Sequence, residues 1–532
     1  MKKIPFIFAL ACLGIKSPAQ SLLKDLVLGK ETYGGKDYPA SSNPYNFTVA
    51  NNTLFFAATD KVTGSATNGH QVWKSDGTAA GTVFLKVLKS PYSGFTNLTK
   101  HFTNANGIVF FTHCVQGSHY ELWKTDGTEA GTVMVKQFYN TVNGYDEPQG
   151  FCAIGNTVYF TANDGNGIEL WKSDGTAGGT AEVIDLDTRV VGGSKIGGLS
   201  PGGPLIPFNG KVYFPGEAGN SDTELYSSDG TSGGTGLVKD IKVGGNGSSP
   251  SNFIVFNNVL YFQAAGQMWK TDGTAGGTLM VSTEAFNGPV IFKNKIYFNN
   301  QYPGALCSSD GTTTTVLKDS VGSISGANND YLFTLYNKSI PTPPYVLPYF
   351  YKSDGTAAGT VRIPYYVGAS ASFNVIGNKM YTTRLDSGQT TGYNVWESDG
   401  TYAGTKKTPL GSTGFQIYKN SLFYCGTDTV AGNELWIYTP DGSAPSRISS
   451  LEEANKIHVY PNPSNGTFNI SLNRGTQKAE LVVTNLLGEK VYARHLENPE
   501  ETLNLAHLKN GIYLFQILTE KGMQTQKIIL QK

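Results

Sequence analysis

Short, almost wholly apolar runs recur along most of the chain. They stand at 54–56, 109–111, 212–214, 260–262, 296–298 and 422–424, and each combines Phe or Tyr with Val, Leu or Ile. Runs without polar alternation are typical of strands that are covered on both faces. Asn- or Gly-containing pairs occur at the matching point of the repeat, at 106–107, 155–156, 209–210 and 377–378. Because such pairs tolerate the positive φ of tight turns, each run is predicted to be the second strand of a hairpin.

A second phrase follows each apolar run and is clearest at 121–128, which reads Glu-Leu-Trp-Lys-Thr-Asp-Gly-Thr, with Gly131-Thr132 just beyond it. In the third repeat, strand signals stand at 150–154, 157–160, 168–171 and 181–184. Each unit is therefore predicted to be four strands long. The phrase recurs around Trp73, Trp123, Trp171, Tyr226, Trp269, Cys307, Tyr351 and Trp396, and in decayed form around Trp436.

The Asp-Gly-Thr element is predicted to join the third strand to the fourth. An Asp carboxylate can accept backbone N–H groups within a turn, and Gly takes a conformation that other residues resist. A catalytic Asp would occur once, whereas this one recurs at every turn, so its role is interpreted as structural. The copies are Asp76, Asp126, Asp174, Asp229, Asp272, Asp310, Asp354 and Asp399.

The spacing of these turns predicts the architecture. From Asp76 to Asp399 the average interval is about 46 residues, which fits a four-stranded propeller blade of roughly 40–50 residues. We predict an all-β protein whose main domain is a β-propeller of eight or nine blades in a single ring, with two smaller rings as the alternative. The N-terminal text at 22–26 echoes the fourth-strand text at 237–241, so the N-terminus is predicted to complete the last sheet and remove its exposed edge.

Composition agrees with many short strands and narrows the partners. The chain has 64 Gly, 29 Tyr and 28 Phe, and Lys plus Arg equals Asp plus Glu at 41 each. The chain therefore has no excess of positive charge that would attract nucleic acid. The mature chain would keep four dispersed cysteines, which indicate no disulfide framework; they are Cys114, Cys152, Cys307 and Cys425.

The N-terminus has the pattern of a secretory signal peptide over residues 1–20, with Lys2-Lys3, an apolar run at 4–15 and small residues near Ala19. Lipidation at Cys12 is not favoured because Ala9 stands where a Leu is needed. No other stretch is apolar enough for a transmembrane segment in the mature chain. The protein is expected to be secreted or attached to the outer-membrane surface.

These phrases resemble the ELWxxDGT repeat family, whose name is the repeated text. The resemblance covers about 22–448 and departs from the pattern at Tyr226, Cys307, Tyr351 and the Trp436 unit. It implies an exported bacterial protein with a propeller-like fold. It implies no activity, because the family is defined by its repeat.

The last 80 residues have a different sequence pattern. Its motifs are Tyr460-Pro461-Asn462-Pro463, 485–488, 508–513 and the basic, apolar end 527–530. Alternating polar and apolar residues predict strands at 479–484, 490–493, 502–505, 511–518 and 526–530. This stretch resembles the type A C-terminal sorting domain of the type IX secretion system of the Bacteroidota. The resemblance implies transport through that machinery. We expect three regions: a signal peptide at 1–20, the propeller at 21–450 and an Ig-like β-sandwich sorting domain at 451–532.

No catalytic, cofactor-binding or metal-binding residue is predicted. His113, Cys114 and His119 form a metal cluster on paper only, because four convergent ligands are missing. The stretch 163–167 reads as a turn or as a weak calcium loop. Variable loops, including the proline-rich 337–348, favour recognition of an unknown extracellular glycan or protein. The sequence therefore favours a non-catalytic binding or adhesion module, with a glycan-directed hydrolase acting at the propeller axis as the alternative and a structural spacer as a third hypothesis.

Overall fold

A computed structural model describes most of the chain between residues 19 and 531. The described residues are 19–27, 30–33, 36–60, 69–88, 99–116, 119–139, 147–165, 167–191, 194–195, 197–200, 202–219, 222–300, 304–319, 321–327, 330–336, 349–366, 370–376, 379–385, 393–401, 403–411, 415–428, 432–440, 458–460, 464, 466–471, 479–485, 489–496, 498, 500–519 and 522–531. They form strands and turns without an α-helix. The chain divides into two compact units, Met1–Gly442 and Ser443–Lys532, here called the repeat unit and the tail unit.

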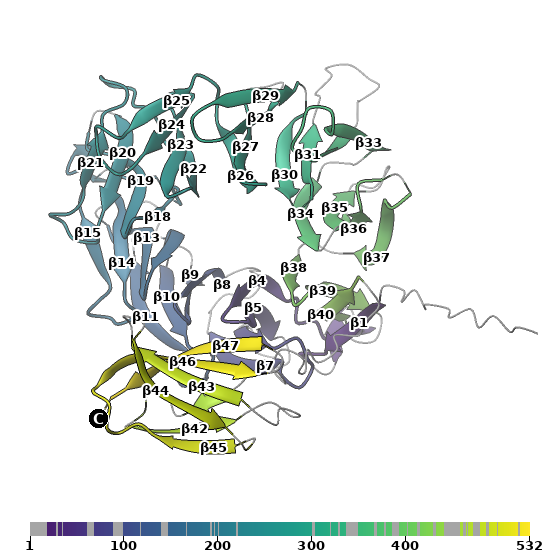
Figure 1. The fold of residues 1–532 in the computed structure, drawn as a ribbon. Coiled ribbons are helices and arrows are strands. Elements are labelled where there is room, and N and C mark those ends of the chain that lie inside the picture. The colour runs from purple at the N-terminus through teal and green to yellow at the C-terminus, as the bar shows by residue number, and fades with distance from the viewer. Residues whose placement is uncertain are drawn as a thin grey trace, which may run out of the picture. The chain divides into compact units, whose positions relative to one another are not determined.

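The described part of the repeat unit contains nine four-stranded antiparallel sheets, numbered here repeat sheets 1 to 9 in chain order (Figure 1). Sheets 1 to 3 consist of β4 (Tyr45–Ala50), β5 (Thr53–Asp60), β6 (Gly69–Ser75) and β7 (Val83–Leu88); β8 (Thr99–Ala105), β9 (Ile108–Gln116), β10 (His119–Thr125) and β11 (Val133–Tyr139); and β12 (Gln149–Ile154), β13 (Thr157–Asn163), β14 (Ile168–Ser173) and β15 (Ala181–Ile184).

Sheets 4 to 6 follow the same strand order. They consist of β18 (Ile206–Phe208), β19 (Lys211–Glu217), β20 (Thr223–Ser228) and β21 (Gly236–Lys239); β22 (Ser251–Phe256), β23 (Val259–Ala264), β24 (Gln267–Thr271) and β25 (Leu279–Ser282); and β26 (Asn287–Phe292), β27 (Lys295–Asn299), β28 (Leu306–Ser309) and β29 (Thr314–Lys318).

Sheets 7 to 9 complete the series. They consist of β30 (Ser323–Ala327), β31 (Leu332–Tyr336), β32 (Tyr349–Ser353) and β33 (Val361–Tyr366); β34 (Ser370–Ile376), β35 (Lys379–Leu385), β36 (Tyr393–Ser398) and β37 (Lys406–Gly411); and β38 (Phe415–Tyr418), β39 (Ser421–Asp428), β40 (Gly432–Thr439) and β1 (Ala19–Lys24). Two ribbons stand outside the sheets: β2 (Lys30–Tyr33) with β3 (Lys36–Pro39), and β16 (Val190–Val191) with β17 (Ser194–Lys195).

The N-terminal strand β1 supplies the outermost strand of sheet 9. It pairs antiparallel with β40, with Ser21 opposite Ile437 and Leu22 opposite Trp436. Leu23 is buried with Leu435 of sheet 9 and Phe56 of sheet 1. The echo between 22–26 and a fourth-strand sequence thus predicted the place of this strand correctly.

Each pair of neighbouring sheets shares one apolar cluster, and the series of clusters closes on itself. One cluster joins sheet 1 to sheet 2 and another joins sheet 9 back to sheet 1 through Phe423, Ile437, Leu54 and Trp73. The other seven clusters join the intervening pairs in order. The apolar second-strand runs are buried because they contribute to these interfaces on both faces of their sheets.

The Asp-Gly-Thr element forms the turn between third and fourth strands, as predicted. In sheet 2, Asp126 Oδ1 accepts hydrogen bonds from Thr128 N at 2.8 Å and Thr128 Oγ1 at 2.7 Å, and Thr128 Oγ1 accepts one from Gly131 N at 2.9 Å. A Cβ on Gly131 would lie 2.1 Å from Asp126 Oδ1, so the carboxylate occupies the space that any other residue needs. Gly127 has φ of +87° and faces Phe55 of the preceding sheet. Turn chemistry and sheet packing therefore require the same sequence.

The tail unit contains two antiparallel sheets around one core. They are β41 (His458–Tyr460), β42 (Thr467–Ser471) and β45 (Glu500–Asn504), and β44 (Lys490–Leu496), β43 (Ala479–Asn485), β46 (Gly511–Thr519) and β47 (Gly522–Leu530). Phe468 and Ile470 of the first sheet share a fully buried cluster with Leu481, Val483 and Phe515 of the second. The strands predicted from alternation in this part of the sequence are confirmed.

Candidate binding site in the inner wall of the repeat unit

Two of the glutamates that stand two positions before a repeated Trp hold backbone segments in place by hydrogen bonds. Glu169 accepts hydrogen bonds from Leu186 N at 3.1 Å and Gly198 N at 2.7 Å. Glu434 accepts one from Leu26 N at 2.8 Å, and from Ser42 N at 2.8 Å and Ser42 Oγ at 2.6 Å. Both side chains are fully buried. Burial raises the pKa of Glu169 to about 8 and that of Glu434 to about 7, against the lowering effect of these donors. We call these two residues the clamp glutamates, because each ties the segment after a fourth strand to its sheet.

The turn aspartates are mostly exposed, and their pKa values shift in the opposite direction. Hydrogen bonds from the Thr two positions ahead lower the pKa of most of them below the usual value for Asp. In each of them the oxygen Oδ1 accepts a hydrogen bond from its own turn.

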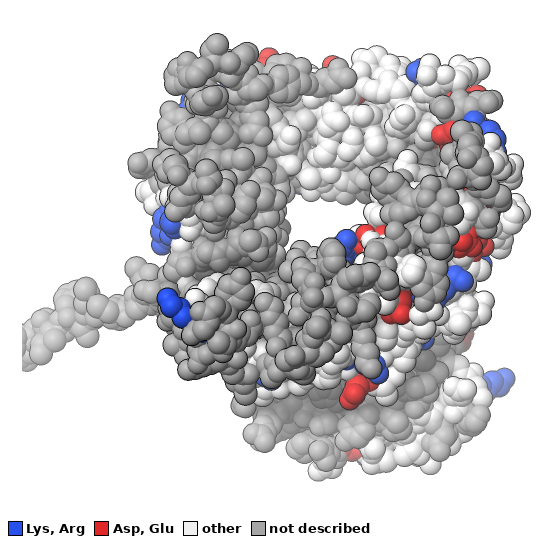
Figure 2. Space-filling view, turned by 180° about the vertical axis from the view of Figure 1, so that it is seen from behind, with Lys and Arg blue, Asp and Glu red and all other residues white. Residues whose placement is uncertain are grey.

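The first strand of each sheet lies at the inner side of the ring that the sheets form in Figure 1. In sequence order, β4 contacts β8, β8 contacts β12, and so on to β34, and β38 contacts β4. Figure 2 shows the opening that this inner wall surrounds. Several first strands begin with a bulge around one residue of positive φ; these residues are Asn46, His101, Gly150, Asn252 and Gly288.

The inner wall is irregular at sheet 4. Its first strand, β18, has only three residues, and the segment 202–205 occupies the place before it. Gly202 N donates a hydrogen bond to Thr161 Oγ1 of β13 at 3.0 Å. A Cβ on Gly150 would lie 2.8 Å from Gly203 O, so the two backbones approach as closely as glycine alone permits. This contact joins the inner walls of sheets 3 and 4 without side chains between them.

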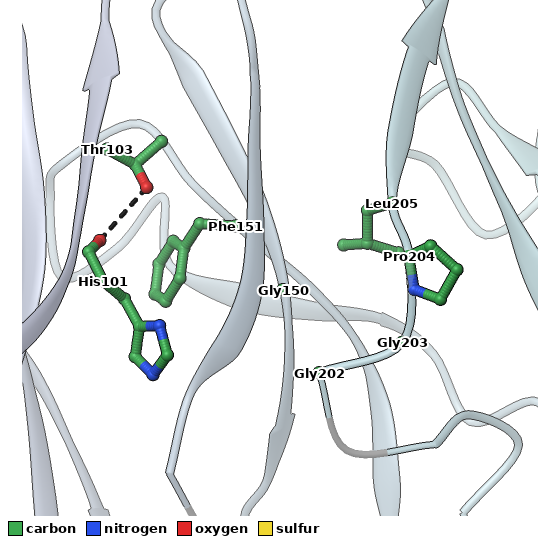
Figure 3. A pocket seen from close by; sticks show the side chains of 8 residues that line it. All are labelled: His101, Thr103, Gly150, Phe151, Gly202, Gly203, Pro204 and Leu205. Atoms are coloured by element: carbon green, nitrogen blue, oxygen red, sulfur yellow. Dashed lines mark hydrogen bonds between the residues drawn. The ribbon is translucent and has the colours of Figure 1, made fainter. Parts of the chain in front are cut away.

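A shallow cavity of about 320 Å³, widely open to solvent, lies at this irregularity (Figure 3). The first strands of sheets 2 and 3 and the segment before β18 supply its lining. In Figure 3 the rings of His101 and Phe151 lie on one side and Pro204 and Leu205 on the other. The lining residues are His101, Thr103, Gly150, Phe151, Gly202, Gly203, Pro204 and Leu205.

An aromatic stack and an ion-pair network hold one side of this cavity. The rings of His101 and Phe151 stack at 6.0 Å between centroids, and Phe151 stacks on buried Phe160 at 4.9 Å. Glu147 Oε2 pairs with Lys100 Nζ at 3.1 Å and Glu147 Oε1 with His101 Nε2 at 3.2 Å. Burial raises the pKa of Glu147, but the His101 hydrogen bond and the Lys100 charge outweigh it, so its pKa lies below the usual value. Glu147 is therefore ionised at neutral pH.

The residues singled out for metal chemistry do not assemble into a site. His113 is buried on β9, where its Nδ1 lies 3.1 Å from Thr99 Oγ1 and it pairs across the strands with Glu121. Cys114 pairs with Tyr120, and His119 with Gln116. Among the described residues, no three His, Cys, Asp or Glu side chains form a group that could hold a metal ion.

Asn163 Oδ1 accepts hydrogen bonds from Gly165 N and Gly167 N, which agrees with a turn at this position. The proline-rich segment 337–348 and Asn166 lie outside the described residues.

The sequence did not predict the inner-wall cavity. Its residues come from three repeats, and none belongs to the repeated phrase. One signal was available: Asp174 and Asp229 stand 55 residues apart, against an average interval of about 46. That insertion carries the Gly202–Leu205 segment.

Comparison with solved structures gives matches at low similarity, among them a β-propeller domain. The β-propeller domain of the Trilobed protease from Pyrococcus furiosus has 8% identity and a TM-score of 0.34, covering 71% of this chain and 99% of that one. Saccharomyces cerevisiae Sqt1 has 10% identity and a TM-score of 0.37, covering 73% and 100%. PorZ, a surface component of the type IX secretion system of Porphyromonas gingivalis, has 10% identity and a TM-score of 0.21, covering 96% and 100%. At these scores the likenesses carry no argument about function. No curated protein matches the sequence.

The tail gives the firm assignment. None of the described residues forms a helix long and apolar enough to cross a membrane. Residues 458–531 match the family described as the secretion system C-terminal sorting domain. A tail of this type IX kind marks proteins that are secreted or attached to the cell surface. The protein is thus an all-β exported protein that carries a C-terminal sorting domain for the type IX secretion machinery.

Proposed function

We propose that the protein is a non-catalytic binding protein of the cell exterior, in which a nine-bladed β-propeller holds an extracellular polysaccharide or protein in its inner-wall cavity. The propeller would span residues 21–450, and an Ig-like sorting domain would span 451–532. The blade number is supported by nine four-stranded sheets joined in a closed series of apolar interfaces. Membership of the ELWxxDGT repeat family and an origin in the Bacteroidota belong to the same proposal.

One observation carries the binding role. The cavity stands where the repeat is interrupted, at the shortened β18 and the Gly202–Leu205 segment. A repeat array needs no such interruption for stability, because each sheet packs only on its neighbours. Pockets lined by a few aromatic and polar groups are the usual places of ligand recognition. The interruption is therefore assigned to function and the regular turns to the fold.

The test is a binding screen on the chain from residue 19 onwards. Glycan and host-protein arrays are probed with and without calcium, and every hit is analysed for reaction products. Binding without products, lost when the cavity is altered, supports the proposal. Hydrolysis products would overturn it in favour of the glycan-directed hydrolase, and binding that is insensitive to the cavity would place recognition on the variable loops instead.

A further inference from the structure

The interface between sheets 1 and 2 contains two buried histidines. His70 on β6 and His113 on β9 are fully buried, and the centroids of their rings lie 5.8 Å apart. Val72 and Phe111 stand two positions from these histidines, on the same strand faces, and belong to the apolar cluster that joins the two sheets. The repeat unit has four histidines, all between residues 70 and 119. Buried imidazoles are thus confined to one interface of the ring.

His113 occupies a position that is small in other repeats. It lies opposite the residue two places before the repeated Trp or Tyr. In four other sheets the residue at this position is Ala58, Ala162, Gly216 or Ala264. The repeat fold therefore does not require an imidazole at this point.

A chain of polar contacts crosses the interface and includes both histidines. Nδ1 of His70 lies 3.0 Å from the hydroxyl of Tyr45 on β4, and that hydroxyl accepts a hydrogen bond from Thr99 N of β8 at 3.4 Å. Thr99 Oγ1 lies 3.1 Å from Nδ1 of His113. Two of the four residues come from each sheet, so these contacts connect the sheets as well as their own strands.

A proton on His70 would disrupt this arrangement. A neutral imidazole carries one N–H group, and an imidazolium carries two. Nε2 of His70 is buried and has no hydrogen-bond partner among the described residues. Whichever nitrogen carries the hydrogen in the neutral ring, the charged ring would therefore have an N–H group at Nε2 without an acceptor. Burial accordingly lowers the pKa of His70 from the usual 6.5 to about 4.

One carboxylate stands opposite the pair. Glu121 on β10 lies opposite His113 in the strand register. Its Oε2 accepts a hydrogen bond from Trp123 Nε1 at 2.7 Å, and its Oε1 accepts one from Gln137 Nε2 at 3.1 Å. Both oxygens thus have donors within sheet 2. Burial accounts for the lowered pKa of His70, without an offset from this carboxylate.

The other surroundings of the pair also disfavour a positive charge. His70 lies opposite an uncharged residue on each neighbouring strand, β5 and β7. The charged side chains next along the adjoining strands are cations, Lys86 on β7 and Lys100 on β8. Lys100 already pairs with Glu147 at 3.1 Å. A charged imidazole at this interface would therefore lack a compensating partner.

We infer that the interface between sheets 1 and 2 is an acid-sensitive seam of the ring, which loosens when the His70–His113 pair takes up a proton while the other interfaces stay closed. Because each sheet is held by its two neighbours, loss of one interface increases the local opening of its strands. β8 belongs to the seam and also carries His101, so the change would reach the inner-wall cavity. The inference does not depend on the proposed binding function, because it concerns the stability of one interface.

The size of the effect follows from the environment of His70 in the two states. In an opened seam His70 meets water and regains its usual pKa of 6.5, against about 4 in the closed seam. The stabilisation by the neutral ring is therefore present above pH 6.5 and is lost as the pH falls from 6.5 towards 4. Between pH 7 and pH 5, opening should become about twentyfold more favourable.

Hydrogen exchange of the chain from residue 19 onwards measures this opening at pH 7 and pH 5, with rates corrected for the intrinsic effect of pH on exchange. We expect the protection of β6 and β9 to fall at least tenfold at pH 5. The protection of β23 and β27 should change by less than threefold, because the interface of sheets 5 and 6 contains no histidine.

Three variants assign the effect to the pair. His70→Asn removes the titrating ring but keeps a polar group near the Tyr45 hydroxyl, and it should reduce the loss of protection to less than threefold. His119→Asn is the matched control, because His119 lies on β10 of sheet 2 but is partly exposed, and it should respond as the parent does. His113→Ala introduces the residue that three other sheets have at this position and admits solvent to His70, so it should also reduce the loss.

The inference is overturned if the protection of β6 and β9 does not fall at pH 5, or if that of β23 and β27 falls equally. It is also overturned if His70→Asn responds to acid as the parent does. Should His70→Asn fail to fold, the response of His113→Ala decides in the same way.

Discussion

The outer turns and the inner wall of the repeat unit follow different rules. At the turns, all eight copies of Asp-Gly-Thr share a hydrogen bond from the Thr N to the Asp Oδ1. Seven of them add one from a Gly N to the Thr Oγ1, and the Asp310 turn is the exception. At the inner wall, the residue of positive φ is Asn, His or Gly, one first strand is shortened, and a cavity results. The same ring thus separates a region under uniform packing demands from one that is free to differ.

The difference shows where a repeat protein can acquire a function. A turn that docks on the preceding sheet is needed in every copy, so a change there destabilises the ring. A first-strand residue at the inner wall belongs to no repeated turn and can be replaced in one repeat alone. Substitutions at the turns should therefore affect stability, and substitutions at the wall should affect binding.

The largest loss of stability is expected from removing β1, the outermost strand of sheet 9. Deleting residues 19–24 removes β1 and exposes the edge of β40. The loss of buried Leu23 alone should lower the free energy of unfolding by about 3–5 kcal/mol. Urea denaturation followed by tryptophan fluorescence measures it, with the chain starting at residue 19 as the control. An unchanged midpoint would mean that the ring does not depend on its N-terminal strand.

A single turn supplies the next test. A Cβ on Gly179 would lie 2.1 Å from Asp174 Oδ1, whereas one on Gly178 meets nothing within 4 Å. Gly179→Ala should displace the carboxylate and lower the free energy of unfolding by about 1.5–3 kcal/mol, the value of hydrogen bonds to a charged group. Gly178→Ala should change it by less than about 0.5 kcal/mol, as at other surface positions. Equal losses in the two variants would contradict the structural role of the Asp. Binding should be unchanged in both.

The stability of the protein should decline at both acidic and alkaline pH. The folded pKa of Glu169 is raised to about 8 and that of Glu434 to about 7, so their stabilisation is present below the usual Glu pKa and is lost as pH rises through 7 to 8. The folded pKa of turn residues such as Asp126 is lowered, so their contribution is present above the usual Asp pKa and is lost as pH falls below it. Denaturation between pH 3 and 9 should show both declines.

Glu169→Gln tests the alkaline side of that profile and should flatten it. Glu121→Gln is the control, because Glu121 holds the same repeat position but is partly exposed and accepts a hydrogen bond from Trp123 Nε1 at 2.7 Å. A profile that is equally steep in Glu169→Gln and the parent would show that this buried carboxyl does not set it.

The smallest stability effect is expected at the inner wall. His101 has φ of +58° and a side chain that is 32% exposed, and Asn occupies the corresponding positions at 46 and 252. His101→Asn removes one partner of Glu147 but keeps Lys100 as the other, so it should lower the free energy of unfolding by about 1 kcal/mol, less than Gly179→Ala. Thermal unfolding of this variant beside Asn46→Gly measures it. A loss as large as that of Gly179→Ala would remove the distinction between wall and turn.

Much of the fold could be predicted from the sequence because its determinants are local. The Asn-Gly pairs at 106–107 and 209–210 have positive φ at both residues, as their hairpins require. The Asp-Gly-Thr turns are closed by atoms that lie within seven residues of one another. The tail was recognised because its strands alternate and its short motifs are contiguous.

The proposed binding site was decided by tertiary structure alone. His101, Phe151 and Pro204 belong to three repeats, and they meet because closure of the ring brings successive first strands side by side. The clamp role of Glu169 likewise depends on Gly198, which lies beyond the fourth strand of its sheet. The sequence by itself thus determined the repeated strands and turns, whose energies depend on near neighbours in the chain. Only the packing of sheet on sheet decided which non-repeated residues share a cavity, because no local interaction brings them together.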